Sequence, residues 1–520
     1  MLKKEVGLIS VLFFAFIFRV WGIGFGLPGI FHIDENFFPY NAIYALSHKL
    51  HIATLLYGNL LPYLLGLLYM GYFSLLWIVG IVHSPAEFLI KYYYEDPTAL
   101  YLIGKLTMVI FSTLTVWLIY QIGKKLFNIR TALIGAIFLA TAFLWVAETK
   151  VMKGDIPGTF FIFVSLYFLT REKDKPNVRN SVLGGVFWGL AMGARYYFVS
   201  FLIPVLLFYL VCIRRRQIIP LVRFVGVGII SFLLVTPSFF LQFSNVVFSI
   251  SREIQIQTKA PWIDPGNYPI WLYFLLVHLR QGIGTIFLLF SLIGGLYVLI
   301  RRNLYRIVLL ISFPAIYFVL LNNTTNFARY SLPLIPFFSL LSANLLDNLA
   351  TYIKIRPHRY CLIGGLVLLS VYPNLLNIVK YNYLISQVDI RLIAKEWIEE
   401  YIPSGAKIVN EGGENYKEIS QIGVPLHKES SLIEKRREEA IKRGTPGRSF
   451  SLIRKANETR KAVYNVRNVL QVDTIERYVE EDVEYVVMVS WARREPLPLE
   501  IKVAKKIPII SRFLVNNIYR

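Results

Sequence analysis

Cysteine is nearly absent from this sequence. Its two cysteines, Cys212 and Cys361, belong to no metal-ligand spacing. Two thiols cannot supply the several cross-links of a small disulfide-rich fold, so that class of protein is excluded. Both lie within or at the edge of apolar runs, where a free cysteine usually behaves as a small apolar side chain. We therefore expect both cysteines to act as apolar fillers.

Charge is also sparse, and it is unevenly distributed. Charged residues make up 17% of the chain and hydrophobic residues 55%, and the charges are concentrated in the last quarter. Many apolar runs reach the roughly 20 residues that an α-helix needs to cross a bilayer. The sequence therefore predicts an α-helical polytopic membrane protein, with a transmembrane domain over residues 1–380 and a soluble extracytoplasmic α/β domain over residues 381–520.

The chain contains no nucleic-acid-binding module, no Gly-rich phosphate motif and no long-period repeat. Its net charge of +22 nevertheless needs an explanation. Much of the Lys and Arg lies in short loops between apolar runs, which is the positive-inside pattern of membrane proteins. The partners that this charge indicates are anionic lipid head groups of the bilayer rather than nucleic acid.

The loop charges also predict the topology. Lys3 and Lys4 precede the first span, residues 6–27, and place the N-terminus in the cytoplasm. This run is long for a signal peptide and lacks a clear cleavage site, so we expect a retained anchor. If the next apolar run, residues 55–82, crossed the membrane, the basic loops that follow would face outward. We therefore expect residues 36–82 to form interfacial or re-entrant helices of a first outer loop.

Ten further spans follow with this parity, which makes eleven in total and leaves the C-terminal domain outside. They cover residues 99–121, 131–147, 156–170, 181–194, 198–213, 219–241, 282–300, 304–321, 330–350 and 360–378. Outside these spans the sequence predicts an interfacial helix over 271–279, helices over 390–401, 432–443 and 474–480, a turn over 403–405, and strands over 407–410 and 483–489. The protein is expected in the cell (plasma or inner) membrane.

The predicted outer loops gather ionisable residues at the ends of spans. The first loop holds His32, Asp34 and Glu35 directly after the first span. The other loops add two acids and five cations, which are Glu148, Asp155, Lys150, Lys153, Arg195, Arg280 and Arg329. Charged groups near a membrane are costly to desolvate and often mark function.

An acid pair beside scattered cations suits sugar transfer from a lipid phosphate. The phosphate leaves as an anion and needs cations to stabilise its charge. The acceptor hydroxyl needs a base, for which Asp34 is the natural candidate, with Glu35 orienting it or binding the acceptor. In-line attack would then invert the anomeric centre.

Each of these outer-loop residues also has a purely structural explanation. Lys150 and Lys153 are equally well explained as side chains that reach lipid head groups. Arg195 and Arg329 each precede a tyrosine, as interface anchors do. Asp155 also suits a helix N-cap, and His32 suits a hydrogen-bonding neighbour better than a metal ligand. The acids are conceivable ligands of a divalent cation, but the usual carboxylate spacings are absent, so no metal site is assigned.

Four stretches together resemble GT-C-type glycosyltransferases, with protein O-mannosyltransferases and aminoarabinose (lipid A) transferases as the nearest groups. They are His32-x-Asp34-Glu35, Lys153-Gly154-Asp155-Ile156-Pro157, Gly189 to Tyr196, and Arg329-Tyr330-x-x-Pro333-x-x-Pro336. A fifth stretch, from Asp389-Ile390-Arg391 to Trp397-Ile398 and on to Pro403-x-Gly405, resembles prokaryotic members with an outer α/β tail. The similarity spans roughly residues 1–410.

The resemblance implies roles for individual residues. It implies that Asp34 is the base, that Asp155 is the second-loop acid, and that Lys153, Arg195, Arg329 and Tyr330 bind the lipid phosphate, with His32, Lys150 and Arg280 as further candidates. Arg195 stands where many relatives have Lys, and a MIR-type repeat domain is absent, which argues against a eukaryotic-style protein mannosyltransferase. The implied partners are a lipid-linked sugar donor and a protein, glycan or lipid acceptor.

Two other classes of function remain open from the sequence. A transporter or lipid flippase would place ionisable residues near the membrane midplane and show inverted repeats. Here the loop charges lie at the outer ends of predicted spans and no repeat is found. A non-catalytic membrane scaffold would leave the Asp34-Glu35 pair without a task.

Overall fold

A computed structural model of the chain describes residues 2–32, 34–55, 58–174, 177–212, 218–259, 268–322, 324, 327–353, 355–411, 426, 462–469 and 483–487. The chain divides into two compact units. The larger unit combines Met1–Ile23, Tyr40–Gly66 and Gly104–Leu384, and the smaller unit combines Gly24–Pro39, Leu67–Ile103 and Ile385–Arg520. The predicted domain boundary at residue 380 stays a prediction.

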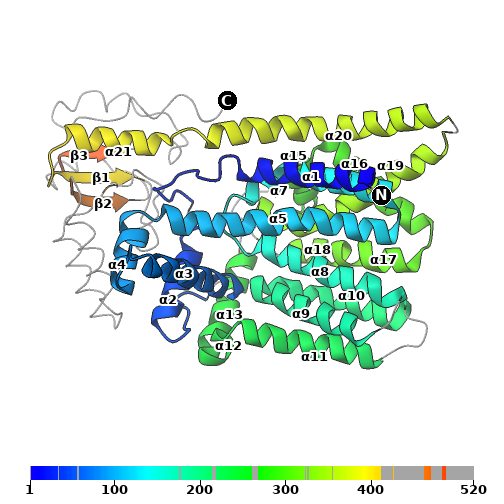
Figure 1. The fold of residues 1–520 in the computed structure, drawn as a ribbon, viewed down its shortest axis with the longest axis horizontal. Helices are drawn as coiled ribbons and strands as arrows, with labels where there is room; N and C mark the ends of the chain where they lie inside the picture. Colours follow the sequence, from blue (N-terminus) through cyan, green and yellow to red (C-terminus); the bar gives the residue numbers. More distant parts are fainter. Residues whose placement is uncertain are drawn as a thin grey trace. The chain divides into compact units, whose positions relative to one another are not determined.

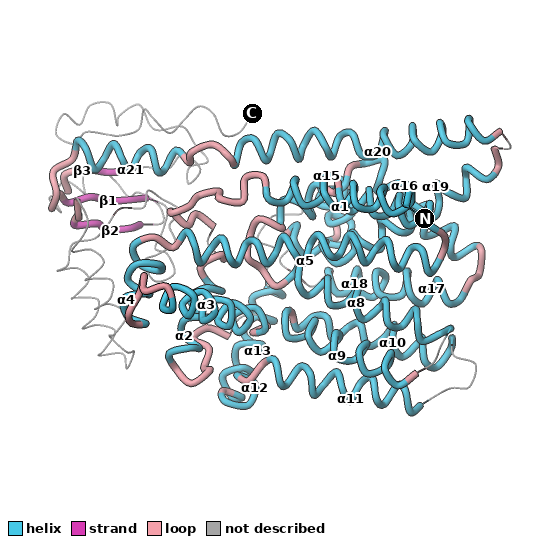
Figure 2. The backbone as a smooth tube through the Cα atoms, viewed as in Figure 1, coloured by secondary structure: helices cyan, strands magenta, loops and turns pink. Residues whose placement is uncertain are grey.

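Most of the described chain is helical, as Figure 2 shows, and the colours of Figure 1 follow the helices along the chain. The first group is α1 (Leu2–Val20), α2 (Phe37–Ser47), α3 (Leu60–Ile78), α4 (Pro85–Leu89), η1 (Ile90–Glu95), α5 (Thr98–Leu126), α6 (Ile129–Ala140) and α7 (Phe143–Glu148). The second group is α8 (Asp155–Asp174), α9 (Val178–Ala194), η2 (Tyr196–Phe201), α10 (Leu202–Leu207), η3 (Phe208–Cys212), α11 (Ile218–Val235), α12 (Ser238–Leu241) and α13 (Phe243–Lys259). The third group is α14 (Ile270–Tyr273), η4 (Phe274–Leu279), α15 (Arg280–Ile283), α16 (Thr285–Ile300), α17 (Leu304–Leu310), α18 (Ser312–Leu321), η5 (Ala328–Leu334), α19 (Ile335–Thr351), α20 (Arg356–Ile385) and α21 (Ile390–Tyr401).

The core of the larger unit is built from close helix packing. α9 packs against both α8 and α11, and α19 packs against both α6 and α16. Where α9 meets α11, a Cβ atom at Gly189 would collide with the backbone of Gly228, so glycine sets how closely these two backbones approach. Trp145 and Trp188 are among the largest fully buried side chains of this core.

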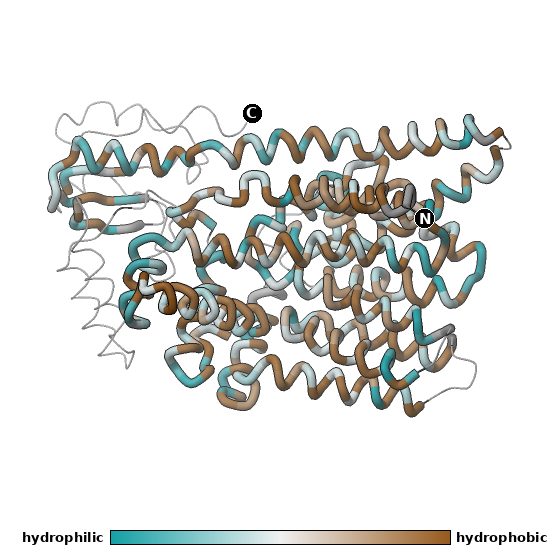
Figure 3. The backbone as a smooth tube through the Cα atoms, in the orientation of Figure 1, coloured by the Kyte–Doolittle hydropathy of each residue, from teal (hydrophilic) through white to brown (hydrophobic). Residues whose placement is uncertain are grey.

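Apolar helices account for most of the predicted spans. Six helical stretches of the described chain are long and apolar enough to cross a membrane, or seven if the bent pair around Gly284 counts as one span. Shorter apolar helices occupy Val6–Val20, Ile129–Ala140 and Tyr196–Val211. One long apolar stretch is α3, drawn in brown with paler segments in Figure 3, which we predicted to be interfacial or re-entrant. The number of eleven spans and the interfacial placement of α3 stay predictions.

The C-terminal part of the smaller unit has the predicted α/β character. Helix α21 has the predicted bounds, and the turn after it includes Gly405, whose φ of +91° favours glycine. Strand β1 (Lys407–Glu411) lies between β2 (Asn465–Val469) and β3 (Tyr485–Val487) in a parallel sheet of order β2-β1-β3. The register pairs Ile408 with Val466 and with Tyr485. Strand β2 was not predicted.

Other predictions had different outcomes. The predicted helix over 271–279 is helical, as α14 and η4. The predicted helices over 432–443 and 474–480 lie outside the described residues. Cys361 is exposed on α20, and its role as a small apolar filler stays a prediction. A run of apolar residues does not reveal which face of the helix is buried.

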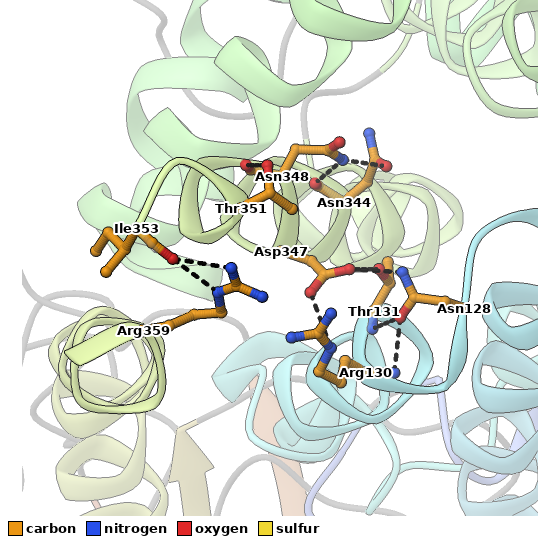
Figure 4. A network of polar contacts seen from close by, with 9 residues as sticks. All are labelled: Asn128, Arg130, Thr131, Asn344, Asp347, Asn348, Thr351, Ile353 and Arg359. Atoms are coloured by element: carbon orange, nitrogen blue, oxygen red, sulfur yellow. Dashed lines mark hydrogen bonds and ion pairs between the residues drawn. The ribbon is translucent and has the colours of Figure 1, made fainter. Parts of the chain in front are cut away.

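A buried carboxylate joins two distant segments of the larger unit, as Figure 4 shows. Asp347 on α19 is 4% exposed. Its Oδ2 accepts hydrogen bonds from Asn128 Nδ2 at 2.5 Å and from Thr131 Oγ1 at 3.0 Å. The Nε atom of Arg130 lies 3.5 Å from Oδ1. Asn128 also caps α6 by accepting from two backbone N–H groups. The carboxylate therefore fixes the start of α6 against α19.

Replacing Asp347 should destabilise the protein. Asp347→Ala removes the acceptor of the buried Thr131 hydroxyl and of the Asn128 amide, and a buried donor left unsatisfied costs about 1–3 kcal/mol. We expect a lower melting temperature in detergent. Glu87→Gln is the matched control, because Glu87 forms an exposed i,i+4 pair with Lys91 and such pairs contribute little. An Asp347→Ala protein as stable as the control would show that the network does not hold the two helices.

Candidate functional site

Several of the predicted outer-loop cations converge on one buried carboxylate in the larger unit. Asp155 is the first residue of α8 and is 0% exposed. Arg195 Nη2 lies 2.5 Å from its Oδ2 atom, and the Tyr197 hydroxyl donates to its Oδ1 atom at 2.9 Å. We call Asp155 together with Lys153, Arg195 and Arg329 the cation cluster. Both carboxylate oxygens accept hydrogen bonds from side chains, so Asp155 is more than a helix cap.

Lys153 and Arg329 complete this cluster. Lys153 is 4% exposed, and its Nζ atom lies 3.8 Å from Glu148 Oε2. The Arg329 guanidinium lies over the Phe327 ring at 4.3 Å and over the Tyr330 ring at 5.2 Å from the centroids. Burial of Lys153 contradicts the alternative in which this side chain reaches lipid head groups.

The electrostatics of the cluster favour an ionised Asp155, which lies just before the predicted span that begins at residue 156. Burial alone would raise the pKa of this carboxyl group. The positive charges of Arg195, Arg329 and Lys153, and the hydrogen bond from Arg195, instead hold its pKa below the usual value. The cluster has three positive side chains, and together with the two acids Asp155 and Glu148 its net charge is +1. Such a cluster is suited to binding an anion.

Glycine explains how the second and third predicted outer loops come together. A Cβ atom on Gly154 would collide with the carbonyl oxygen of Ala194. The chain on either side carries the paired residues Asp155 and Arg195. The Lys153-Gly154-Asp155 motif therefore needs glycine because its backbone lies directly against the turn that carries Arg195.

Lys150 has a different environment from the cation cluster. It is 3% exposed, and its ammonium donates to the carbonyl oxygens of Phe18, Arg19 and Trp21 at 2.7–3.0 Å. Burial, with repulsion from Arg19 and Lys105, lowers the pKa of Lys150 to about 7. Lys150 therefore caps the C-terminal end of α1 and does not reach lipid head groups, which corrects that alternative.

The predicted acidic residues of the first loop lie in the smaller unit. We call residues 30–32 and 34–36 the acid loop. Asn36 is fully buried, and its Oδ1 atom accepts from the Tyr101 hydroxyl at 2.7 Å and from the Tyr93 hydroxyl at 3.5 Å. Glu35 is 4% exposed, whereas Asp34 is only partly buried. Asn36 thus anchors one end of the loop and leaves Asp34 the more accessible carboxylate.

His32 forms a hydrogen bond within the acid loop, as the sequence analysis favoured. Its Nδ1 atom accepts a hydrogen bond from the backbone N–H of Asp34 at 3.2 Å. The accepting nitrogen carries no proton in this arrangement. In the described part of the chain no group of three or more His, Cys, Asp or Glu residues is placed to hold a metal ion.

The remaining predicted site residues differ in exposure, and the structure adds residues that were not predicted. Tyr330 is buried beside Arg329, whereas Arg280 is exposed at the start of α15. Sequence reasoning missed Tyr197, because nothing distinguishes its pattern from that of an interfacial aromatic residue. It also missed the buried Arg19 and Lys105, although a charge inside an apolar run is a recognisable signal.

Comparisons with known proteins give the site a context. Residues 103–240 match the family model described as dolichyl-phosphate-mannose-protein mannosyltransferase. These residues include Asp155, Lys153 and Arg195. No curated protein matches the chain.

Solved structures share the fold at low sequence identity. ArnT from Cupriavidus metallidurans in the apo state is 11% identical with a TM-score of 0.52, over 79% of this chain and 82% of that one. The same protein bound to undecaprenyl phosphate is 12% identical with a TM-score of 0.50, over 79% and 83%. The oligosaccharyltransferase of Archaeoglobus fulgidus in the apo form is 13% identical with a TM-score of 0.51, over 77% and 58%. The chain thus spans little more than half the length of the oligosaccharyltransferase.

These findings confirm two predictions. The predicted resemblance to GT-C-type glycosyltransferases is confirmed by the family match and by the shared fold. The predicted fold class is also confirmed, because the chain is an α-helical polytopic membrane protein with a C-terminal α/β part. The individual roles of the site residues stay predictions.

Gly154 offers a test of the loop contact. Gly154→Ala should force the second loop away from Ala194 and lower the melting temperature by a few degrees, since overpacking costs about 1–3 kcal/mol. Gly226→Ala is the control, because a Cβ atom there meets nothing within 4 Å. Alanine is also the better helix former, so this control should be neutral or stabilising. Equal melting temperatures for the two variants would contradict the close approach.

Proposed function

We propose that this chain is a membrane glycosyltransferase that moves a sugar from a polyprenyl- or dolichyl-phosphate carrier to an acceptor hydroxyl at the outer face of the membrane. The observation that carries the proposal is the cation cluster. The positive charges of Lys153, Arg195 and Arg329 act on the buried carboxylate of Asp155. Asp155, Lys153 and Arg195 lie within the residues that match the mannosyltransferase family model. A structure of similar fold is bound to undecaprenyl phosphate, which supports a lipid-phosphate donor.

The cation cluster would bind the phosphate of the donor. Asp155 holds one end of the Arg195 guanidinium, and a guanidinium has further N–H donors that fit a phosphate in a fixed plane. When the bond between the sugar and the phosphate breaks, the phosphate leaves as an anion. The positive charges of Lys153, Arg195 and Arg329 stabilise the charge that develops on it, so the leaving group needs no proton.

Asp155 then has a positioning role. Both of its carboxylate oxygens accept hydrogen bonds, from Arg195 and from Tyr197. It orients the cation that binds phosphate, and a carboxylate so occupied is a poor acceptor for a substrate proton. The sequence grouped Asp155 with the catalytic acids, and the contacts favour this narrower role.

Asp34 would act as the general base. It is the more accessible acid of the acid loop, and a partly exposed carboxylate can accept a proton from an acceptor hydroxyl. Glu35, which is buried beside it, would orient the loop or hold the acceptor. Attack of the hydroxyl opposite the departing phosphate inverts the anomeric centre.

The predicted topology belongs to the same proposal. With a cytoplasmic N-terminus and an extracytoplasmic C-terminal domain, the cation cluster and the acid loop would both belong to outer loops of a protein of the cell membrane. The partners are the lipid-linked donor, an acceptor and the bilayer. The donor sugar and the class of acceptor, whether protein, glycan or lipid, are not part of the proposal.

The role of Asp34 can be tested in proteoliposomes with a panel of polyprenyl-phosphate sugars. Asp34→Asn should lower the rate of polyprenyl phosphate release about 10²–10⁴-fold, the usual contribution of a general base. Binding of undecaprenyl phosphate should be unchanged, because the base is not assigned to the phosphate. Glu87→Gln is the control for loss of an exposed acid of the same unit. Equal turnover of Asp34→Asn and the wild type would remove Asp34 from the mechanism.

Phosphate binding can be tested separately with undecaprenyl phosphate alone. Arg195→Ala should weaken its binding by about 10–100-fold, since a hydrogen bond to a charged group contributes about 1.5–3 kcal/mol. Asp155→Asn should weaken binding less, because the guanidinium remains but loses its orientation. Arg252→Ala is the control, because Arg252 is exposed on α13. Unchanged affinity in Arg195→Ala would contradict the assignment of the cation cluster.

A further inference from the structure

An arginine at the start of α21 contacts the acid loop within the smaller unit. The Arg391 guanidinium carbon lies 3.6 Å from the centroid of the Phe31 ring. The same guanidinium is held by Asp389, with Nε at 2.8 Å from Oδ1 and Nη2 at 2.7 Å from Oδ2. Asp389 also caps α21 by accepting from the backbone N–H of Arg391. The guanidinium is therefore fixed in plane and position against the ring.

The chain before the acid loop is shaped around Phe31. Its ring is 8% exposed. A Cβ atom on Gly26 or on Gly29 would collide with the ring, and one on Gly29 would also lie 3.2 Å from Leu392 of α21. Residues 26–31 thus fold closely around the ring, and Arg391 covers it. Phe31 precedes Asp34 by three residues, so its position constrains where that carboxylate lies.

The acid loop is therefore held at both ends by different contacts. Asn36 is held by Tyr101 and Tyr93, and Phe31 is held by Arg391. The first contact belongs to the early part of the chain. The contact between Arg391 and Phe31 joins residues about 360 positions apart. The proposed function assigns no role to the segment that carries Arg391.

We propose that Asp389 and Arg391 form a clamp on Phe31 that positions Asp34, so that the C-terminal segment takes part in the reaction as a positioning element. This inference rests on the proposed function, because it assumes that Asp34 acts as the base. Arg391 has a positioning role in this proposal, and the contact through which it acts is the one with Phe31.

The chemistry of the clamp requires arginine rather than any cation. A flat guanidinium stacks on an aromatic face while it pairs through two nitrogen atoms with a carboxylate. Lysine keeps the charge but provides neither the plane nor the paired geometry. Arg391→Lys should therefore behave as a loss of the clamp.

A labelling experiment reports the position of the loop without using activity. Ile30 is 2% exposed, so a cysteine placed there should react slowly with a membrane-impermeant maleimide. In a full-length chain that carries Ile30→Cys, Cys212→Ser and Cys361→Ser, we expect Arg391→Lys to raise the labelling rate about tenfold, as expected for loss of about 1.4 kcal/mol. Glu399→Gln, which breaks the Lys395 ion pair on the same helix, should leave the labelling rate unchanged. An unchanged rate in Arg391→Lys would overturn the clamp.

The activity of the same variants, in chains with Ile30 intact, shows whether the clamp matters for the reaction. Arg391→Lys and Phe31→Leu should lower kcat about tenfold with the KM for the donor unchanged, whereas the control Glu399→Gln should keep kcat. If Arg391→Lys does not fold, as judged by gel filtration, Asp389→Asn provides the milder variant. Faster labelling with an unchanged kcat would overturn the positioning role.

The activity of Asp34→Asn is measured in the same assay, and it distinguishes the proposal that Asp34 is the base from the proposal that the clamp positions it. If Asp34→Asn is inactive and Arg391→Lys lowers kcat, both are supported. If Asp34→Asn is fully active, the proposed base is wrong and the positioning role falls with it, while the labelling rate still decides whether the clamp holds the loop.

Discussion

The ion pair between Asp155 and Arg195 is the contact on which the cation cluster depends. Both side chains are buried, and removing one partner of such a pair leaves an uncompensated charge, at a cost of about 3–5 kcal/mol. The pair joins the start of α8 to the residue that follows α9, and the absence of a side chain at Gly154 allows this approach. Lys153 is placed by the same turn. The positive charges of Lys153, Arg195 and Arg329 thus act together on one buried carboxylate.

The sequence predicted the membrane class, the α/β character of the C-terminal part and most of the clustered residues. These predictions succeeded because bilayer length and the desolvation cost of charge leave direct traces in a sequence. Tyr197 and the covering of Lys150 by α1 carbonyl oxygens were not predicted, since neither leaves a local pattern. Arg19 and Lys105 do leave a local pattern, because each is a charged residue inside an apolar run. The prediction considered charges at the ends of spans and did not include these two residues.

The contact between Arg391 and Phe31 shows a second limit of sequence patterns. The predicted helix over 390–401 begins after Asp389, which caps it by accepting from the backbone N–H of Arg391. The guanidinium at the same position contacts an aromatic ring from the beginning of the chain. Hydrophobic periodicity and capping rules describe neighbours in sequence, whereas a contact over such a separation depends on the folded arrangement of the unit.

The strand order of the small sheet has a consequence for synthesis. Strand β1 lies between two partners that follow it in the chain by more than 50 residues, and Ile408 and Val409 on it are each 1% exposed. Until residues 465 and 485 emerge, both edges of β1 lack their native partners, and such edges invite pairing with other chains. The sheet has high contact order and is expected to complete late and slowly. Newly made chains would therefore depend on protection of this strand until the sheet is complete.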